Sequence, residues 1–265
     1  MNYVVLFVFK LKVYIKYSIK FKRVRMVVND FKIVIKAKKV PVNINNEIIE
    51  YIQDTSLQNN HLQCKIFFQK TLIAQGVILD FYKEFEILQD FNQNLFTHIL
   101  TFEYKGQEYQ KYTYFGKKLY EMKYLKRDPI KQEIRETYVD EIISHFNGYI
   151  KYLKENYTDL KIVFIPSSSQ IPDEIATKLS AINSIPLKTI ISKNTQVSSK
   201  SMINLSTQQF NKYSIDLSQS NISDTFVLID DVMGTTASIC ESMYKLYDFN
   251  KKVNFFFIPL KDVKR

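Results

Sequence analysis

Hydrophobic and polar residues alternate along the beginning of the chain. Phe9, Leu11, Val13 and Ile15 are separated by single residues that are mostly lysine, and the alternation returns in residues 31–35. A period of two with β-branched and aromatic residues is typical of strands, because successive side chains of a strand point to opposite faces. We therefore expect strands in this part of the chain.

Residues 62–115 contain further strand-like runs. Residues 101–104 and 109–115 flank Lys105-Gly106-Gln107, and this arrangement predicts a β-hairpin. The pattern of residues 80–100 is mixed and is compatible with a helix.

Helical spacing replaces the strand pattern after this point. It extends over residues 117–126 and 130–157, where one apolar stripe recurs every three or four residues. The stripe consists of Ile134, Val139, Ile142, Ile143, Phe146, Ile150 and Leu153. We expect it to pack against the core.

Short apolar strands alternate with helices in the last hundred residues. Strands are predicted over 161–166, 186–191, 225–229 and 253–259, and helices over 172–179 and 237–247. Such alternation, with strands that are apolar throughout, is typical of a parallel α/β sheet. The sequence thus predicts two regions, a β-rich (α+β) region over 1–115 and an α/β region over 116–265.

Composition narrows the classes of protein. The chain has 265 residues, of which 46% are hydrophobic and 24% charged, as in folded globular proteins. Its five glycines are never closer than ten residues, which excludes a glycine-rich phosphate loop, a dinucleotide-binding turn and a nucleophile elbow. Two cysteines, Cys64 and Cys240, exclude a disulfide scaffold and a thiolate zinc site, and they fit a reducing compartment.

Membrane and secretory segments are not predicted. No stretch approaches the ~18 uninterrupted apolar residues of a membrane-spanning helix. The apolar residues 3–9 lack a preceding basic residue and a following cleavage signal. We expect a cytoplasmic protein with no membrane partner.

The net charge of +10 is confined to the start of the chain. Residues 1–40 hold 11 of the 37 basic residues and one of the 27 acidic residues, so the other 225 residues carry 26 of each. The basic residues form either a strand face that grips nucleic-acid phosphates or a solvated edge strand protected by lysine. A third interpretation is that translation begins at Met26, which removes seven basic residues and no acidic ones.

The strongest chemical signal follows the predicted strand 225–229. Asp230 and Asp231 end this strand, a turn rich in small and hydroxyl residues follows, and a helix begins. The amides of a helix start and nearby hydroxyls favour a phosphate, whereas the carboxylates suit sugar hydroxyls or Mg²⁺. A phosphorylated sugar fits this combination. The other interpretations are a simple helix cap and a Walker-B-like strand end, and the latter lacks its glycine-lysine loop.

This arrangement resembles the phosphoribosyl pyrophosphate signature of type I phosphoribosyltransferases. The order of features is most similar to ComF-like, competence-associated proteins. Leu119–Tyr124 looks like their upstream leucine/lysine-tyrosine helix, and Ile162–Pro166 with Ser167–Ser169 looks like their first core strand and pyrophosphate loop. Residues 194–210 are a weaker echo of the segment before the signature strand. The resemblance covers about residues 116–265 and implies a parallel-sheet phosphoribosyltransferase-like core.

The resemblance also implies a mechanism. The 5′-phosphate of phosphoribosyl pyrophosphate would lie on Gly234, Thr235, Thr236, Ala237 and Ser238. The ribose hydroxyls, directly or through Mg²⁺, would meet Asp230 and Asp231, and the pyrophosphate would meet Ser167, Ser168 and Ser169. A nitrogen nucleophile would then displace pyrophosphate through an oxocarbenium-like state.

The loop departs from the family pattern in two ways. Gly234 stands where a hydroxyl or small residue is usual and Thr236 where glycine is usual, and a carboxylate that serves some members as a base is missing at Gly234. These departures keep a second hypothesis open, a non-catalytic sensor or nucleic-acid adaptor with this fold. A phosphosugar hydrolase is a third. Residues 192–224, with Lys193 and Lys200, form either a lid or a surface loop.

Overall fold

The structure is a computed structural model of the chain. The residues it describes are 14–16, 25–27, 31–37, 48–51, 62–89, 95–124, 129–194, 212–218, 220–234 and 237–262.

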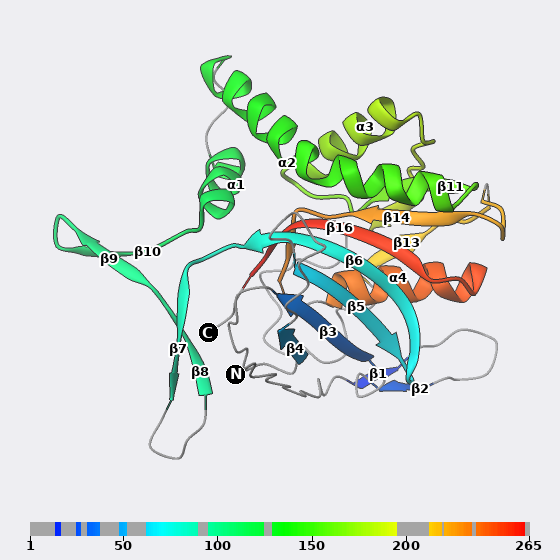
Figure 1. Ribbon diagram of the computed structural model, residues 1–265, viewed down its shortest axis with the longest axis horizontal. Coiled ribbons are helices and arrows are strands. Elements are labelled where there is room, and N and C mark those ends of the chain that lie inside the picture. The colour runs from blue at the N-terminus through cyan, green and yellow to red at the C-terminus, as the bar shows by residue number, and fades with distance from the viewer. Residues whose placement is uncertain are drawn as a thin grey trace.

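A mixed eight-stranded sheet forms the centre of the described part of the chain (Figure 1). Its strand order is β11-β14-β16-β6-β5-β3-β4, and β15 pairs with β16 beyond the end of β14. The bounds are β3 Phe31–Ala37, β4 Ile48–Tyr51, β5 Leu62–Phe68, β6 Thr71–Phe81, β11 Leu160–Phe164, β14 Thr225–Ile229, β15 Val232–Met233 and β16 Asn254–Lys261.

The two halves of this sheet differ in strand direction. β11, β14, β16 and β6 are mutually parallel, whereas β6–β5 and β5–β3 are antiparallel and β3–β4 is parallel. The prediction of parallel strands is therefore confirmed for β11, β14 and β16, and the sheet as a whole is mixed. Because β6 pairs with β16, the sheet continues across the boundary predicted at residues 115 and 116.

Helices cover both faces of the sheet (Figure 1). The helices are α1 Tyr114–Tyr124, α2 Pro129–Asn156, α3 Ile171–Asn183 and α4 Ala237–Asn250. Alternate residues of β14 enter different cores: Phe226 and Leu228 pack with α4, whereas Val227 and Ile229 pack with α1, α2 and α3. The protein therefore has helix, sheet and helix layers.

The predicted apolar stripe of α2 lies in the second of these cores. Val139, Ile142, Ile143, Phe146, Ile150 and Leu153 are all buried there, which confirms the prediction. The side chain of Ile134 lies outside the described residues.

Two hairpins extend away from the sheet (Figure 1). β9 (Thr101–Tyr104) and β10 (Gln107–Gln110) pair across a turn at Lys105 and Gly106, which have φ of 51° and 73°, so the predicted hairpin is confirmed. The helix considered for residues 80–100 is wrong. β7 (Phe85–Gln89) and β8 (Leu95–Ile99) form an antiparallel pair there, because two short runs with aromatic and branched residues are separated by turn-forming Asp and Asn.

The remaining strands are short. β1 (Tyr14–Lys16) and β2 (Arg25–Val27) pair within the region expected to form strands. The strand predicted over 186–191 is reduced to one parallel bridge between Ile162 and Leu187, after which β12 (Ile191–Lys193) pairs antiparallel with β13 (Tyr213–Ile215). Among the described residues, no helix is long and apolar enough to cross a membrane.

Gly76 allows the two sequence regions to share one sheet. It is the register partner of Phe256, and a Cβ atom at Gly76 would lie within 3.0 Å of the Phe256 carbonyl oxygen and ring. Strand β6 therefore approaches β16 over this residue without a side chain between them.

We predict that Gly76→Ala lowers the free energy of unfolding by about 1–3 kcal/mol, because the added methyl group overpacks the β6–β16 contact. Gly148→Ala is the matched control. Gly148 lies on α2 with nothing within 4 Å of an added Cβ, so alanine should stabilise the helix by roughly 0.5–1 kcal/mol. Urea denaturation of the two variants measures both effects, and equal effects would contradict the role given to Gly76.

Candidate functional site

Two carboxylates lie directly beyond the end of β14. Every residue of β14 is buried, and Asp230 and Asp231 follow with exposed fractions of only 8% and 6%. The Asp230 amide donates to the Phe257 carbonyl at 3.2 Å, and Asp230 Oδ1 accepts from the Asp231 amide at 2.8 Å. The pair is therefore held at the carboxyl end of a central parallel strand, the position where open α/β sheets bind ligands.

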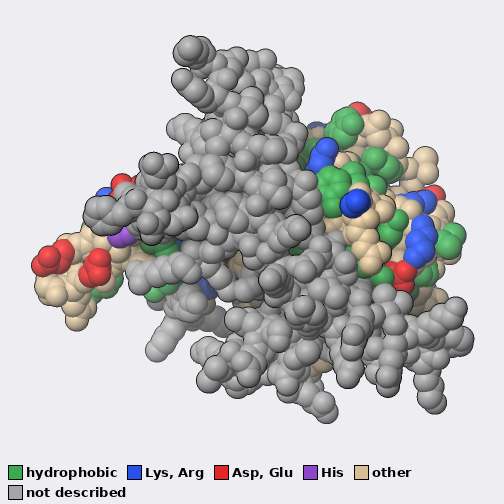
Figure 2. All heavy atoms as spheres, turned by 90° about the horizontal axis from the view of Figure 1, so that it is seen from below, with side chains coloured by type: hydrophobic (Ala, Val, Ile, Leu, Met, Phe, Trp, Pro, Cys, Tyr) green, Lys and Arg blue, Asp and Glu red, His purple; other side chains and the backbone are tan. Residues whose placement is uncertain are grey.

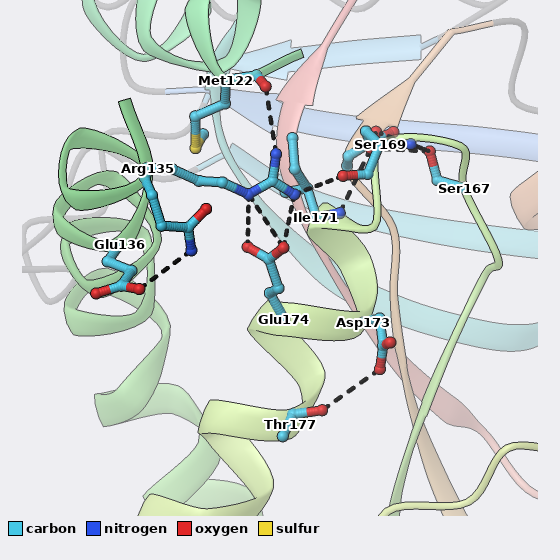
Figure 3. Close-up of polar contacts among 11 residues, drawn as sticks. Met122, Arg135, Glu136, Ser167, Ser169, Ile171, Asp173, Glu174 and Thr177 are labelled. Carbon is cyan, nitrogen blue, oxygen red and sulfur yellow. Dashed lines mark hydrogen bonds and ion pairs between the residues drawn. The ribbon is translucent and has the colours of Figure 1, made fainter. Parts of the chain in front are cut away.

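Asp231 Oδ2 accepts from groups that are distant in the sequence. Lys123 Nζ of α1 lies 2.9 Å away, Ser169 Oγ 3.0 Å and Ser167 Oγ 3.3 Å. The two serine hydroxyls are 2.9 Å from each other, in the turn after β11 (Figure 3). The structure thus brings Ser167 and Ser169 to Asp231, whereas Ser168 is exposed.

The surroundings of Asp230 disfavour its negative charge. Burial raises the pKa of Asp230 well above the usual range of a carboxyl, and the neighbouring Asp231 raises it further. The Asp231 amide and the cations Lys123 and Lys212 act in the opposite direction. A cation or a hydroxyl donor from a ligand would stabilise the charged form of the pair.

The turn after the pair leads from β15 to α4. The Gly234 carbonyl accepts from Lys261 Nζ at 3.3 Å, and a Cβ atom at Gly234 would meet nothing within 4 Å. Thr235 and Thr236 lie outside the described residues, and Ala237 begins α4. Ser238, one residue later, hydrogen-bonds the side chain of Tyr213. The structure therefore places the ends of the predicted phosphate loop but does not describe its centre.

A buried cluster beside the site is absent from the sequence prediction. Lys245 Nζ donates to Glu241 Oε1 and to the Tyr213 carbonyl, each at 2.6 Å. Burial raises the pKa of Glu241 to about 7 and that of Tyr213 to about 12, and the Asp230 charge contributes to the Tyr213 shift. Only the four-residue spacing of Glu241 and Lys245 on a helix signals this pair in the sequence.

The described residues contain no cluster of three or more His, Cys, Asp or Glu side chains suited to a metal ion. Asp230 and Asp231 supply two carboxylates. Mg²⁺ in proteins is commonly held by one or two carboxylates together with substrate phosphates and water, so this pair suits a metal that is shared with a phosphate ligand.

Lys123 is the residue whose importance the sequence indicated least. In the sequence Lys123 is one residue of the segment Leu119–Tyr124, and no motif there indicates a role for it. Its ammonium contacts Asp231, which lies more than a hundred positions later in the sequence. The residues around Lys123 do not distinguish it from neighbouring lysines such as Lys117 and Lys118.

We predict that Glu241 makes stability depend on pH. Its pKa is raised on folding, so the folded protein holds its proton more tightly and stability declines as pH rises from about 4.5 to about 7. The free energy of unfolding of the protein minus that of Glu241→Gln should therefore decrease by at most roughly 3 kcal/mol across this range. Urea denaturation at several pH values measures the difference. A difference that is independent of pH would contradict the prediction.

Two comparisons with known proteins find no match to this chain. A scan against models of protein families finds none that matches the chain. A search of curated proteins likewise finds no match.

Proposed function

We propose that this protein binds phosphoribosyl pyrophosphate with Mg²⁺ and transfers phosphoribose to a nitrogen nucleophile, with release of pyrophosphate. The observation that carries the proposal is the buried pair Asp230–Asp231 at the carboxyl end of β14. Ser167, Ser169 and Lys123 contact Asp231 there. Carboxylates, hydroxyls and an ammonium within one site match a ligand with sugar hydroxyls and phosphates. The proposal includes a phosphoribosyltransferase-like core for the three-layer fold.

Each part of this ligand has a matching group. The start of α4, with the hydroxyls and amides of residues 234–238, suits the 5′-phosphate. Asp230 and Asp231 suit the ribose 2′- and 3′-hydroxyls. The serine turn (Ser167–Ser169) and the Lys123 ammonium suit the pyrophosphate, because both supply donors beside Asp231.

Mg²⁺ fits the aspartate pair for an electrostatic reason. Burial and the neighbouring carboxylate raise the pKa of Asp230, so a divalent cation there would relieve the repulsion. When bound, the ion would offset the negative charge of the pyrophosphate. Asp230 and Asp231 are the residues that would hold it.

The side chains have distinct tasks in this reaction. Asp230 and Asp231 orient the ribose so that its anomeric carbon faces the nucleophile. The bond from that carbon to the pyrophosphate oxygen breaks, its electron pair leaves with pyrophosphate, and the nucleophile's nitrogen forms the new bond and releases a proton to solvent. Lys123, Ser167 and Ser169 stabilise the charge that develops on the leaving oxygens.

A non-catalytic sensor with the same ligand is the second candidate function. Gly234 lies where some phosphoribosyltransferases have a carboxylate base, and this favours binding without transfer. Pyrophosphate release in the presence of nucleobases or amines distinguishes the two functions.

The nucleic-acid adaptor remains a proposal about residues 1–40, most of which lie outside the described residues. On the face seen in Figure 2, the coloured Lys and Arg side chains are scattered among hydrophobic and polar ones. A salt-dependent mobility shift with DNA or RNA that is lost on deleting residues 1–40 would support this function, and a flat salt response would contradict it.

We predict that Asp230→Asn combined with Asp231→Asn lowers the affinity for phosphoribosyl pyrophosphate at least about 100-fold in the presence of Mg²⁺, since two charged contacts are lost. Isothermal titration calorimetry measures the affinity, and circular dichroism checks that the variant is folded. The exposed Asp248→Asn is the control and should bind normally. Unchanged binding by the double variant would refute the site, and no binding by the unmodified protein would refute the function.

We predict that Lys123→Met lowers the affinity for phosphoribosyl pyrophosphate and for free pyrophosphate about 10- to 100-fold, as expected for one charge-assisted contact. The affinity for ribose 5-phosphate should not change, because that ligand lacks the pyrophosphate. Lys117→Met, an exposed lysine of the same helix, is the matched control. Equal losses for all three ligands would contradict the contact assigned to Lys123.

A further inference from the structure

Arg135 of α2 joins two segments that meet at Asp231. Its Nη2 donates to the Ser169 carbonyl at 2.5 Å, and its Nη1 donates to the Met122 carbonyl at 3.3 Å (Figure 3). Ser169 also donates its hydroxyl to Asp231, and Met122 directly precedes Lys123, another donor to that carboxylate. One guanidinium therefore holds the backbone beside both groups.

The two carbonyls belong to residues at the ends of helices. Met122 lies in the last turn of α1, two residues before the helix ends at Tyr124. Ser169 lies just before α3, next to Gln170, whose φ of 59° is unfavourable for a residue with a side chain. Arg135 stabilises both chain ends in the positions that the site requires.

Glu174 of α3 neutralises the Arg135 charge. Its carboxylate accepts from Arg135 Nε at 2.9 and 3.0 Å and from Nη2 at 2.6 Å, and the Arg135 side chain is 18% exposed. Because its positive charge is already paired, Arg135 is not suited to bind a phosphate itself. Nη2 and Nη1 also donate to the backbone oxygens of Ser169 and Met122.

Lysine cannot replace this arrangement. A guanidinium presents five donors in a rigid plane, and here Nε, Nη1 and Nη2 reach a carboxylate and two carbonyls in different directions. An ammonium is a single point with three donors on a flexible stem. It can keep the ion pair with Glu174 but cannot span both carbonyls.

We propose that Arg135 is a positioning residue for the groups that bind pyrophosphate. It sets Lys123 and the serine turn at the correct separation around Asp231. The inference rests on the proposed function, because it takes the pyrophosphate of phosphoribosyl pyrophosphate as the group that these donors receive. Arg135 acts on the ligand only through Lys123 and Ser169.

The first experiment compares ligand affinities of Arg135→Lys. The variant should bind phosphoribosyl pyrophosphate and free pyrophosphate about 10-fold more weakly in calorimetry with Mg²⁺, and ribose 5-phosphate equally well. Lys178→Met is the matched control. Lys178 Nζ of α3 lies 2.7 Å from Asp140 Oδ1 of α2, so this ion pair joins the same two helices away from the site. Normal pyrophosphate affinity in Arg135→Lys, or the same loss in Lys178→Met, would overturn the proposal.

The second experiment separates positioning from general stability. If Arg135 acts through Lys123, the loss of pyrophosphate affinity in Arg135→Lys combined with Lys123→Met should be smaller than the product of the single losses. Fully multiplicative losses would show that Arg135 does not act through Lys123 and would overturn that part of the mechanism.

A third measurement does not need a ligand. Hydrogen exchange of the ligand-free protein should be faster in Arg135→Lys than in the unmodified protein for residues 118–124 and 167–171 together, while α4 is unchanged. Unchanged exchange in either segment would overturn the proposal. If the unmodified protein binds no phosphosugar, the proposed function fails, and the exchange result alone decides whether Arg135 holds the two segments.

Discussion

The burial of β14 between β11 and β16 is the constraint on which the site depends. All five residues of β14 are buried, and the side chains of residues 226–229 enter the cores on both faces of the sheet. Such a strand can carry polar side chains only where it ends, because an unpaired polar group inside it would lose its hydration. Asp230 and Asp231 lie at that end, and parallel pairing brings the end of β11 and the middle of β16, at Phe257, close to them. The sheet therefore sets both where the carboxylates lie and which segments can reach them.

The negative charge of the site is offset only in part by a cation from a helix. The Asp230–Asp231 pair concentrates negative charge in a buried place, and Lys123 supplies a cation from α1. Arg135 lies near the same groups, but Glu174 neutralises it, so its contribution is geometric. The Lys123 ammonium and the hydroxyls of Ser167 and Ser169 contact Asp231, a combination suited to a ligand with both phosphates and hydroxyl groups.

The accuracy of the sequence predictions depended on how local the signal was. The hairpin at Lys105–Gly106 and the strand Thr225–Ile229 follow from neighbouring residues, and both are present. The helix considered for residues 80–100 was wrong, because mixed patterning does not distinguish two short paired strands from one helix. The partner of β16 was not predicted at all. Pairing with β6 joins residues almost two hundred positions apart, and no short-range pattern reports such a contact.

The sequence by itself determined the chemical types of the candidate site and the elements that carry them. A buried strand that ends in two aspartates, a hydroxyl-rich turn and a helix start are all readable from consecutive residues, and counting showed that the net charge lies in the first forty positions. The tertiary structure alone decided that Ser167, Ser169 and Lys123 meet on one oxygen of Asp231 and that Arg135 connects the segments carrying them. The physical reason is that these contacts depend on strand order and helix packing, which bring together residues separated by dozens of positions.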